Sequence, residues 1–230
     1  MFAKKGNRVI ITGRNKQKLE SAIKEIENGH YIQCDVTDEI QVEELVQKIK
    51  KDFGNLNVLM NNAGQAFIYK LAETENAYFN AKSEIVTNYL SIVSLTEKLL
   101  PLLKQQPEAA IINVSSIVAF APSLSLPTYS ASKAALHSYT KILRLALSQT
   151  TKIKVFEVMP PLVDTEFAKD IPSDKKISPL AVATELMNDF ESDHFEIRVG
   201  SVKEFYNHFL NSPEIALLSM NGIKNPVVSN

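Results

Sequence analysis

A tyrosine, a lysine and a serine stand at a spacing that suits proton transfer. Tyr129 and Lys133 are four residues apart in the run Tyr-Ser-Ala-Ser-Lys, so a helix over this run projects both side chains from one face. An ammonium group beside a phenol favours the phenolate and lowers the pKa of the tyrosine. Ser116 lies upstream at the end of an apolar run, and a strand, loop and helix in succession would bring its hydroxyl to the same rim. The combination predicts a tyrosine that exchanges a proton near neutral pH.

Length, charge and cysteine content narrow the class of protein. The 230 residues fit one domain, 1–230, with a substantial core. A net charge of −1 and a pI near 6.4 give no electrostatic reason to expect nucleic acid or an anionic membrane as partner. No stretch reaches the roughly 18 uninterrupted apolar residues of a membrane span. Cys34 is the single cysteine, so we expect a reducing, cytoplasmic setting, and the four histidines show no metal-ligand spacing.

Short apolar runs alternate with helical patterns along the chain. Strands are expected at 8–12, 31–34, 58–60, 110–114, 154–158 and 195–199. Helices are expected at 15–28, 38–53, 77–105 with a kink at Pro101, from about 128, and at 178–190, before a tail (201–230) with one short helix. Such alternation predicts an α/β fold with a doubly wound parallel sheet, and these folds bind ligands at the carboxyl ends of their strands.

Motifs at these strand ends resemble those of the short-chain dehydrogenase/reductase family, from about Gly6 to Gly200. The motifs are Asn61-Asn62-Ala63-Gly64, Asn88, Ser116, Tyr129-x-x-x-Lys133 and Pro160-Pro161-Leu162-Val163-Asp164-Thr165. The resemblance implies a Rossmann-like oxidoreductase that transfers a hydride between a nicotinamide cofactor and a small carbonyl or alcohol substrate. Within the family, the chain looks most like bacterial oxidoreductases of the lipoteichoic-acid D-alanylation operon type.

The resemblance assigns a catalytic role to four residues. Tyr129 would be the general acid/base, and Ser116 would hold the substrate oxygen. Lys133 would lower the pKa of Tyr129 and grip the nicotinamide ribose, so that Tyr129 and Lys133 also contact the cofactor. Asn88 would carry a water that links Lys133 to solvent; its alternative is a polar residue on a wet helix face. Ser130 and Lys133 also satisfy the Ser-x-x-Lys pattern of penicillin-binding proteins, but no Ser-Asp-Asn or Lys-Thr-Gly accompanies it.

A second group would meet the adenosine half of the cofactor. Asn62, Ala63 and Gly64 would pack against the adenosine, and the alternative is a plain turn after a strand. Asp35 and Val36 resemble the pair that meets the adenine, and the alternative for Asp35 is a helix-start residue.

The rest of the cofactor would meet residues after two other strands. Arg14 stands where a carboxylate would select the ribose hydroxyl of NAD, and an arginine there pairs with the 2′-phosphate of NADP, so NADP is favoured over NAD. After Pro160 the family usually has a glycine, which Pro161 replaces here. Val163 and Thr165 match the residues that hold the carboxamide and the pyrophosphate.

A substrate lid is expected at 166–177, where a short polar sequence does not indicate a large apolar ligand. Members of the family commonly form dimers or tetramers through two long helices, so we expect a homodimer or homotetramer.

The family pattern opens with a strand, a glycine-rich Thr-Gly-x-x-x-Gly-x-Gly turn and a helix, and Met1 to Gly6 resembles the last turn of that helix. We therefore expect a truncated version of the fold that lacks the first strand, the glycine-rich turn and most of the first helix. The lost strand would sit in mid-sheet, and each backbone group that it leaves unpaired costs about 1–3 kcal/mol. The rival hypothesis is a non-catalytic paralogue or fragment that is unable to bind dinucleotide.

Overall fold

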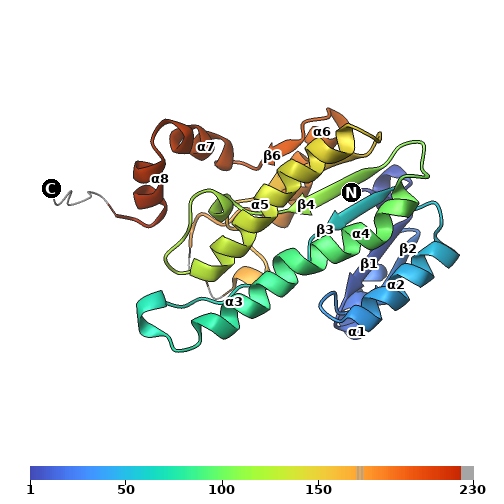
Figure 1. Ribbon diagram of the computed structural model, residues 1–230, viewed down its shortest axis with the longest axis horizontal. Coiled ribbons are helices and arrows are strands. Elements are labelled where there is room, and N and C mark those ends of the chain that lie inside the picture. The colour runs from blue at the N-terminus through green and yellow to red at the C-terminus, as the bar shows by residue number, and fades with distance from the viewer. Residues whose placement is uncertain (170, 172, 224–230) are drawn as a thin grey trace.

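The fold alternates strands and helices in the order that the sequence predicts. The computed structural model describes residues 1–169, 171 and 173–223. Its strands are β1 (Val9–Gly13), β2 (Gly29–Gln33), β3 (Val58–Asn61), β4 (Ala110–Val114), β5 (Lys154–Met159) and β6 (Glu196–Arg198). Its helices are α1 (Lys16–Ile23), α2 (Glu39–Asp52), α3 (Ala77–Ile85), α4 (Ser91–Leu103), α5 (Pro127–Ser148), α6 (Pro179–Glu191), α7 (Val202–Asn211) and α8 (Pro213–Met220) (Figure 1). Every ladder is parallel, which confirms the α/β fold.

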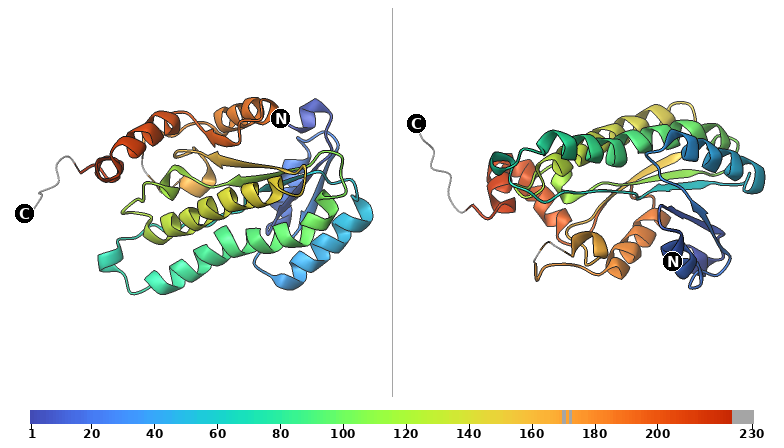
Figure 2. Two further views of the ribbon diagram at one scale, coloured as in Figure 1. Left: turned by 45° about the horizontal axis from the view of Figure 1, so that its top comes forward. Right: turned by 90° about the horizontal axis from the view of Figure 1, so that it is seen from below.

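Helices cover both faces of the strands. Figure 2 shows α2, α3, α4 and α5 on one face, with α1 and α6 on the other. The helices of the first face pack on a hydrophobic core that includes Leu45 of α2, Leu99 of α4 and Ile111 of β4. On the second face, a separate hydrophobic core includes Ile112 and Phe156, and Phe2 and Phe190 pack against it. Neighbouring residues of β4 thus face opposite cores, as in a strand buried on both sides.

The sheet is divided between β1 and β3. β1 pairs with β2, with Val9 opposite Gly29, while β3, β4, β5 and β6 form a separate four-stranded sheet. Within the described residues, no strand joins the two sheets, and Met60 of β3 is 41% exposed. The division falls where the sequence predicts the absent strand, in the middle of the sheet.

The helix starts follow the capping residues of the sequence. Asn15 Oδ1 accepts from Lys18 N at 2.9 Å, Asp38 Oδ1 from Ile40 N at 2.9 Å, and Ser178 Oγ from Ala181 N at 3.1 Å. The helix after Asn15 is shorter than expected. It ends at Ile23, before a turn in which Asn28 has a φ of 54°.

The long helical region expected at 77–105 is irregular at a different place from the predicted kink at Pro101. The helix runs on through Pro101 to Leu103, and the departure from α geometry is a π-helical turn at Val86–Leu90. The tail also differs: it holds two helices, α7 and α8, instead of one, and its last seven residues lie outside the described part. Among the described helices, none is long and apolar enough to cross a membrane.

Candidate active site

Ser116 and Tyr129 meet beyond the carboxyl end of β4. Ser116 caps a 3₁₀ turn, Ile117–Ala119, and its Oγ accepts from Val118 N at 3.3 Å. Pro127 occupies the first turn of α5, which suits its fixed φ and missing N–H, so Tyr129 lies just inside the helix. Both side chains are buried, and the hydroxyl of Ser116 lies close enough to Tyr129 to lower the pKa of its phenol. The sequence therefore predicted their convergence correctly.

The pKa of Tyr129 moves in the opposite direction to the one expected from the lysine. Burial raises this pKa well above its ordinary value, the negative charge of Glu84 adds to the rise, and the Ser116 hydrogen bond only partly offsets them. Lys133 Nζ lies 5.7 Å from the centre of the Tyr129 ring and donates to the carbonyl oxygen of Val114 at 2.7 Å. In this structure desolvation outweighs the lysine, so Tyr129 holds its proton at neutral pH.

Burial also acts on Lys133. It lowers the pKa of the ammonium group to about 8, and the negative charge of Glu157 opposes part of that fall. The charge of Lys133 is therefore poised to change slightly above neutral pH, a range that suits proton transfer.

Asn88 lies in the π-helical turn and is fully buried, so the alternative of a wet helix face is wrong. Its Nδ2 donates to the Gln65 carbonyl oxygen and to Ser132 Oγ, each at 2.8 Å, and its Oδ1 accepts from Gln65 N at 2.8 Å. π-Helical turns are often found at functional sites. Asn88 thus ties the chain after β3 to the residue that precedes Lys133.

The segment after β3 is part of the same site. A methyl group added at Gly64 would lie 3.6 Å from Asn88 Oδ1 and 3.9 Å from Lys133 Nζ. Asn61, which precedes it, donates through Nδ2 to Asn113 Oδ1 at 2.8 Å. Gly64 therefore brings backbone close to Asn88 and Lys133, while Asn62, Ala63 and Gly64 themselves are exposed.

Glu84 is a residue of the site that the sequence analysis missed. Its carboxyl group is fully buried and accepts from Phe67 N at 2.8 Å and from Thr128 Oγ1 at 2.5 Å. Tyr69 OH lies 2.6 Å from the same threonine hydroxyl. Burial raises the pKa of Glu84, and the two hydrogen bonds offset part of the rise. A glutamate at an inward position of α3 was the available sequence feature.

A hollow of about 350 Å³ opens between the end of β1 and α3. It is lined by Arg14, Thr37, Gln65, Phe79, Lys82, Ser83, Val86 and Thr87. Asp35 and Val36 lie in the adjoining loop, where Asp35 Oδ1 accepts from Thr37 N at 2.9 Å and Thr37 Oγ1 at 2.7 Å. Asp38, rather than Asp35, caps α2. Arg14 therefore lines this hollow, and Asp35 lies in the loop that leads to Thr37, another residue of its lining.

The segment after β5 forms the base of the expected lid. Val163 and Ile177 form a parallel bridge, with Asp164 N donating to Ile177 O at 2.8 Å. Between them, Phe167 brings its ring centre to 6.0 Å from that of Tyr129, and Ile171 packs on the Tyr129 cluster. The lid is polar in composition, but these two residues present an apolar side to the site. Residues 170 and 172 of the lid lie outside the described residues.

A parallel α/β sheet with a buried Tyr-x-x-x-Lys helix beside a strand-end serine defines a class of dinucleotide-dependent oxidoreductases. The family model for short chain dehydrogenases matches residues 1–176. The chain belongs to the short-chain dehydrogenase family, whose members are oxidoreductases that use NAD or NADP.

Relatives and solved structures agree with this assignment. The chain is 44% identical over 161 residues to the uncharacterised oxidoreductase DltE of Bacillus subtilis (strain 168), a match that spans 70% of this chain and 63% of DltE. An uncharacterised oxidoreductase of Staphylococcus aureus (strain MW2) is 30% identical over 187 residues, which is 80% of each protein. The expected likeness to DltE-type oxidoreductases is confirmed.

Two solved structures extend the comparison. A short-chain dehydrogenase from Burkholderia cenocepacia J2315 in complex with NADP has a TM-score of 0.80 at 26% identity, covering 97% of this chain and 89% of that one. Serine dehydrogenase from Escherichia coli has a TM-score of 0.64 at 28% identity, covering 70% and 74%.

Proposed function

We propose that this chain acts as an NADP-dependent oxidoreductase that interconverts a carbonyl group and an alcohol on a small molecule. The observation that carries the proposal is the convergence of Ser116, Tyr129 and Lys133, all buried beyond the end of β4, with Lys133 Nζ 5.7 Å from the centre of the Tyr129 ring. Parallel α/β folds bind their ligands at that edge of the sheet.

Each catalytic side chain has a defined task in this proposal. Ser116 holds the substrate oxygen, and Tyr129, which keeps its proton at neutral pH, gives that proton to the oxygen or takes it back. The ammonium of Lys133 stabilises the negative charge that develops on Tyr129. Asn88 holds a water that links Lys133 to solvent, and its bond to Ser132 fixes its amide beside the lysine. The nicotinamide supplies the hydride when the cofactor is bound.

The residues present fit the two ends of the cofactor. The hollow lined by Arg14, Thr37 and Gln65 has room for an adenosine. Asp35 and Val36 directly precede Thr37, and Asn62, Ala63 and Gly64 directly precede Gln65, so both segments would meet that adenosine. At the other end, Tyr129 and Lys133 would hold the nicotinamide ribose. The remaining contacts would come from Pro160, Val163 and Thr165, where the Val163 bridge to Ile177 holds the backbone.

Arg14 is the basis for NADP rather than NAD. Arginine pairs with a phosphate through two parallel hydrogen bonds, and no carboxylate replaces it in Thr12-Gly13-Arg14-Asn15. Lys82 lines the same hollow and adds a second positive charge. The NADP complex of the Burkholderia cenocepacia relative supports the same choice.

The proposal includes a homo-oligomer and a cytoplasmic location. The two long helices expose apolar side chains: Ile142 and Leu145 on α5, and Leu90 in the π-helical turn that leads into α4. A second copy of the chain would cover them. The cytoplasmic location rests on Cys34, which is buried and forms no disulfide.

The divided sheet favours one rival, a chain that cannot bind dinucleotide. An NADPH fluorescence titration separates the two, with turnover of a carbonyl panel as the second measurement and Tyr129→Phe as its control. Saturable micromolar binding with turnover that Tyr129→Phe abolishes supports the oxidoreductase. No binding at any NADPH concentration rejects it for this protein.

A further inference from the structure

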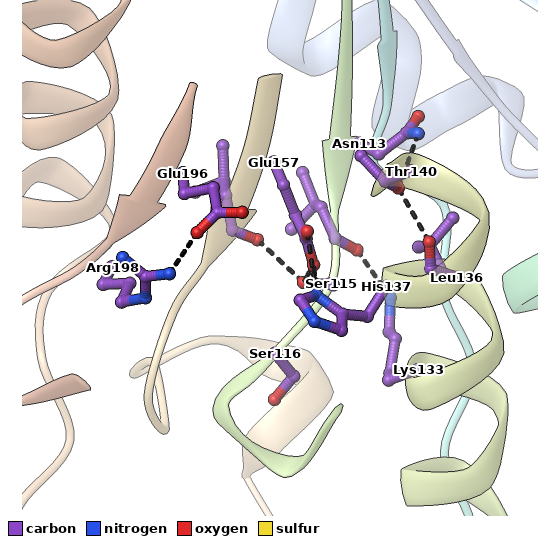
Figure 3. Close-up of polar contacts among 12 residues, drawn as sticks. Asn113, Ser115, Ser116, Lys133, Leu136, His137, Thr140, Glu157, Glu196 and Arg198 are labelled. Carbon is purple, nitrogen blue, oxygen red and sulfur yellow. Dashed lines mark hydrogen bonds and ion pairs between the residues drawn. The ribbon is translucent and has the colours of Figure 1, made fainter. Parts of the chain in front are cut away.

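A buried carboxylate lies directly behind the catalytic lysine. Glu157 of β5 is fully buried, and its Oε1 accepts a short hydrogen bond from Ser115 Oγ. His137 Nδ1 lies 2.9 Å from both carboxylate oxygens of Glu157. We call Ser115, His137 and Glu157 the Glu157 cluster. Figure 3 shows the His137 ring directed at Glu157, with Lys133 one helical turn away on α5.

The cluster touches the catalytic residues through the backbone on two sides. Ser115 is the neighbour of Ser116, and its N–H donates to the carbonyl oxygen of Val158 at 2.9 Å. Lys133 and His137 are four residues apart and therefore share a face of α5. A movement of the Glu157 cluster would displace both Ser116 and Lys133.

The other charges around Glu157 are already paired with one another. Glu196 of β6 is the register partner of Glu157. The carboxylate of Glu196 forms ion pairs with Arg144 of α5 and Arg198 of β6. Lys133 and His137 are therefore the basic side chains of α5 that interact with Glu157, and Glu196 is the neighbouring carboxylate.

We propose that Glu157 is a positioning residue: it carries a negative charge behind the active site, is fixed by Ser115 and His137, and keeps Lys133 in its ammonium form. The geometry supports an ionised carboxylate, because the hydroxyl of Ser115 donates to it and Nδ1 of His137 is placed to donate to both oxygens. A carboxylate only accepts hydrogen bonds, so two donors directed at it satisfy the charged form.

The need for such a charge follows from the burial of Lys133. Removing an ammonium from water favours its neutral form, and the pKa of Lys133 falls to about 8 even with the opposing effect of Glu157. Without the Glu157 charge, the lysine would lose its proton near neutral pH and could no longer stabilise the anion of Tyr129. The consequence for turnover rests on the proposed function, whereas the consequence for the lysine does not.

The charge of Lys133 can be measured without any turnover. Protein labelled with ¹³C at the lysine ε-carbons is titrated by NMR from pH 6 to 10, with the Lys133 signal assigned by its loss in Lys133→Met. In the wild type the titration midpoint is expected near 8. In Glu157→Gln the midpoint is expected about one pH unit lower. The matched control is Glu196→Gln, which removes a carboxylate one strand away and should leave the midpoint unchanged.

Two results overturn the proposal. One is a Glu157→Gln protein whose Lys133 titrates as in the wild type, and the other is an equal change in Glu196→Gln. If Glu157→Gln does not fold, ¹⁵N-histidine spectra of the wild type at pH 7 replace it. The proposal requires a proton on Nδ1 of His137, and an unprotonated Nδ1 would make Glu157 the donor and refute the charge.

Activity then separates this inference from the proposed function. If the wild type turns over carbonyls, the alkaline limb of its pH profile should move to lower pH in Glu157→Gln by the same amount as the Lys133 titration. A wild type without turnover but with the expected NMR titrations rejects the proposed function and supports the electrostatic role of Glu157. Turnover by the wild type, with the pH profile and the Lys133 titration both unchanged in Glu157→Gln, supports the proposed function and rejects the electrostatic role of Glu157.

Discussion

Thr128 donates a 2.5 Å hydrogen bond to the buried carboxyl group of Glu84, one residue before the proposed catalytic tyrosine. The other oxygen of Glu84 accepts from Phe67 N. The carboxyl group thus joins α3, the start of α5 and the chain that follows Gly64. Leu126 and Ala66, which lie at the start of α5 and in the chain after Gly64, pack in the Tyr129 cluster, so Glu84 helps to position two sides of the site.

The stability of the protein should reflect the raised pKa of Glu84. A buried carboxyl group with a raised pKa binds its proton more tightly in the folded state than in the unfolded state. Stability due to this group is therefore greatest at low pH and is lost as pH rises from the ordinary glutamate pKa through the raised one. Glu84→Gln should remove this pH dependence of stability, because a glutamine side chain does not titrate. The variant can keep the hydrogen bonds, since Nε2 of glutamine can donate to Thr128, which can then donate to Tyr69.

The measurement is the melting temperature of both proteins between pH 4 and 7. From the lower to the higher pH, we expect the wild type to lose about 2–4 °C relative to Glu84→Gln. Glu75→Gln, an exposed change near the start of the same helix, is the control. Parallel melting curves for wild type and Glu84→Gln would show that the Glu84 carboxyl does not titrate in this way.

The features predicted well from the sequence are those set by local rules. Asn15, Asp38 and Ser178 cap helices because their short side chains reach the backbone N–H groups three residues on. Tyr129 and Lys133 share a helix face because of the helical repeat alone. The division of the sheet was expected from the family resemblance, which places the absent first strand in mid-sheet.

The features that were missed depend on contacts between distant segments. Glu157 stands between Phe156 and Val158 in a strand buried on both faces, where no alternation marks an inward polar residue. The direction of the Tyr129 pKa depends on how deeply α5 is covered, which spacing cannot show. The apolar side of the expected lid is likewise invisible in its polar composition, because only the structure shows Phe167 and Ile171 in contact with Tyr129 and its cluster.

Tyr129→Phe should abolish turnover and spare cofactor binding. Removing the phenol hydroxyl removes the proton donor but keeps the ring that packs against Phe167. We expect kcat/KM to fall by about 10²–10⁴-fold, with the NADPH Kd within about twofold of the wild type. Tyr139→Phe makes the same change further along α5 and should retain activity. Equal loss in both variants would indicate a structural effect on the helix.

Lys133→Met should stabilise the protein while inactivating it. The folded state holds the pKa of Lys133 below its ordinary value, so the buried charge costs stability at neutral pH, and this cost disappears as pH rises from about 8 towards 10.5. The variant should therefore be more stable than the wild type by about 1–3 kcal/mol at pH 7. The difference should shrink above pH 8. Urea denaturation at pH 7 and pH 10 tests this, and a constant difference would contradict it.

Arg14→Ala should change the choice of cofactor. Loss of a charged partner of the 2′-phosphate is expected to weaken NADPH binding by about 10–100-fold and leave NADH binding nearly unchanged. Lys16→Ala, which removes a positive charge two residues away, is the matched control. Fluorescence titrations with both nucleotides provide the comparison. If both nucleotides weaken equally in Arg14→Ala, the arginine does not distinguish them.

Ile142→Glu should separate the proposed oligomer into monomers. Ile142 and Leu145 are exposed on one turn of α5, and a charge placed there would be buried without a partner if a second copy covered them. Sedimentation velocity should give a smaller species for Ile142→Glu than for the wild type. Gln149→Glu adds the same charge at the exposed end of α5 and should sediment as the wild type does. A wild type that is monomeric at all concentrations would instead leave these apolar side chains facing solvent and remove the basis for the oligomer.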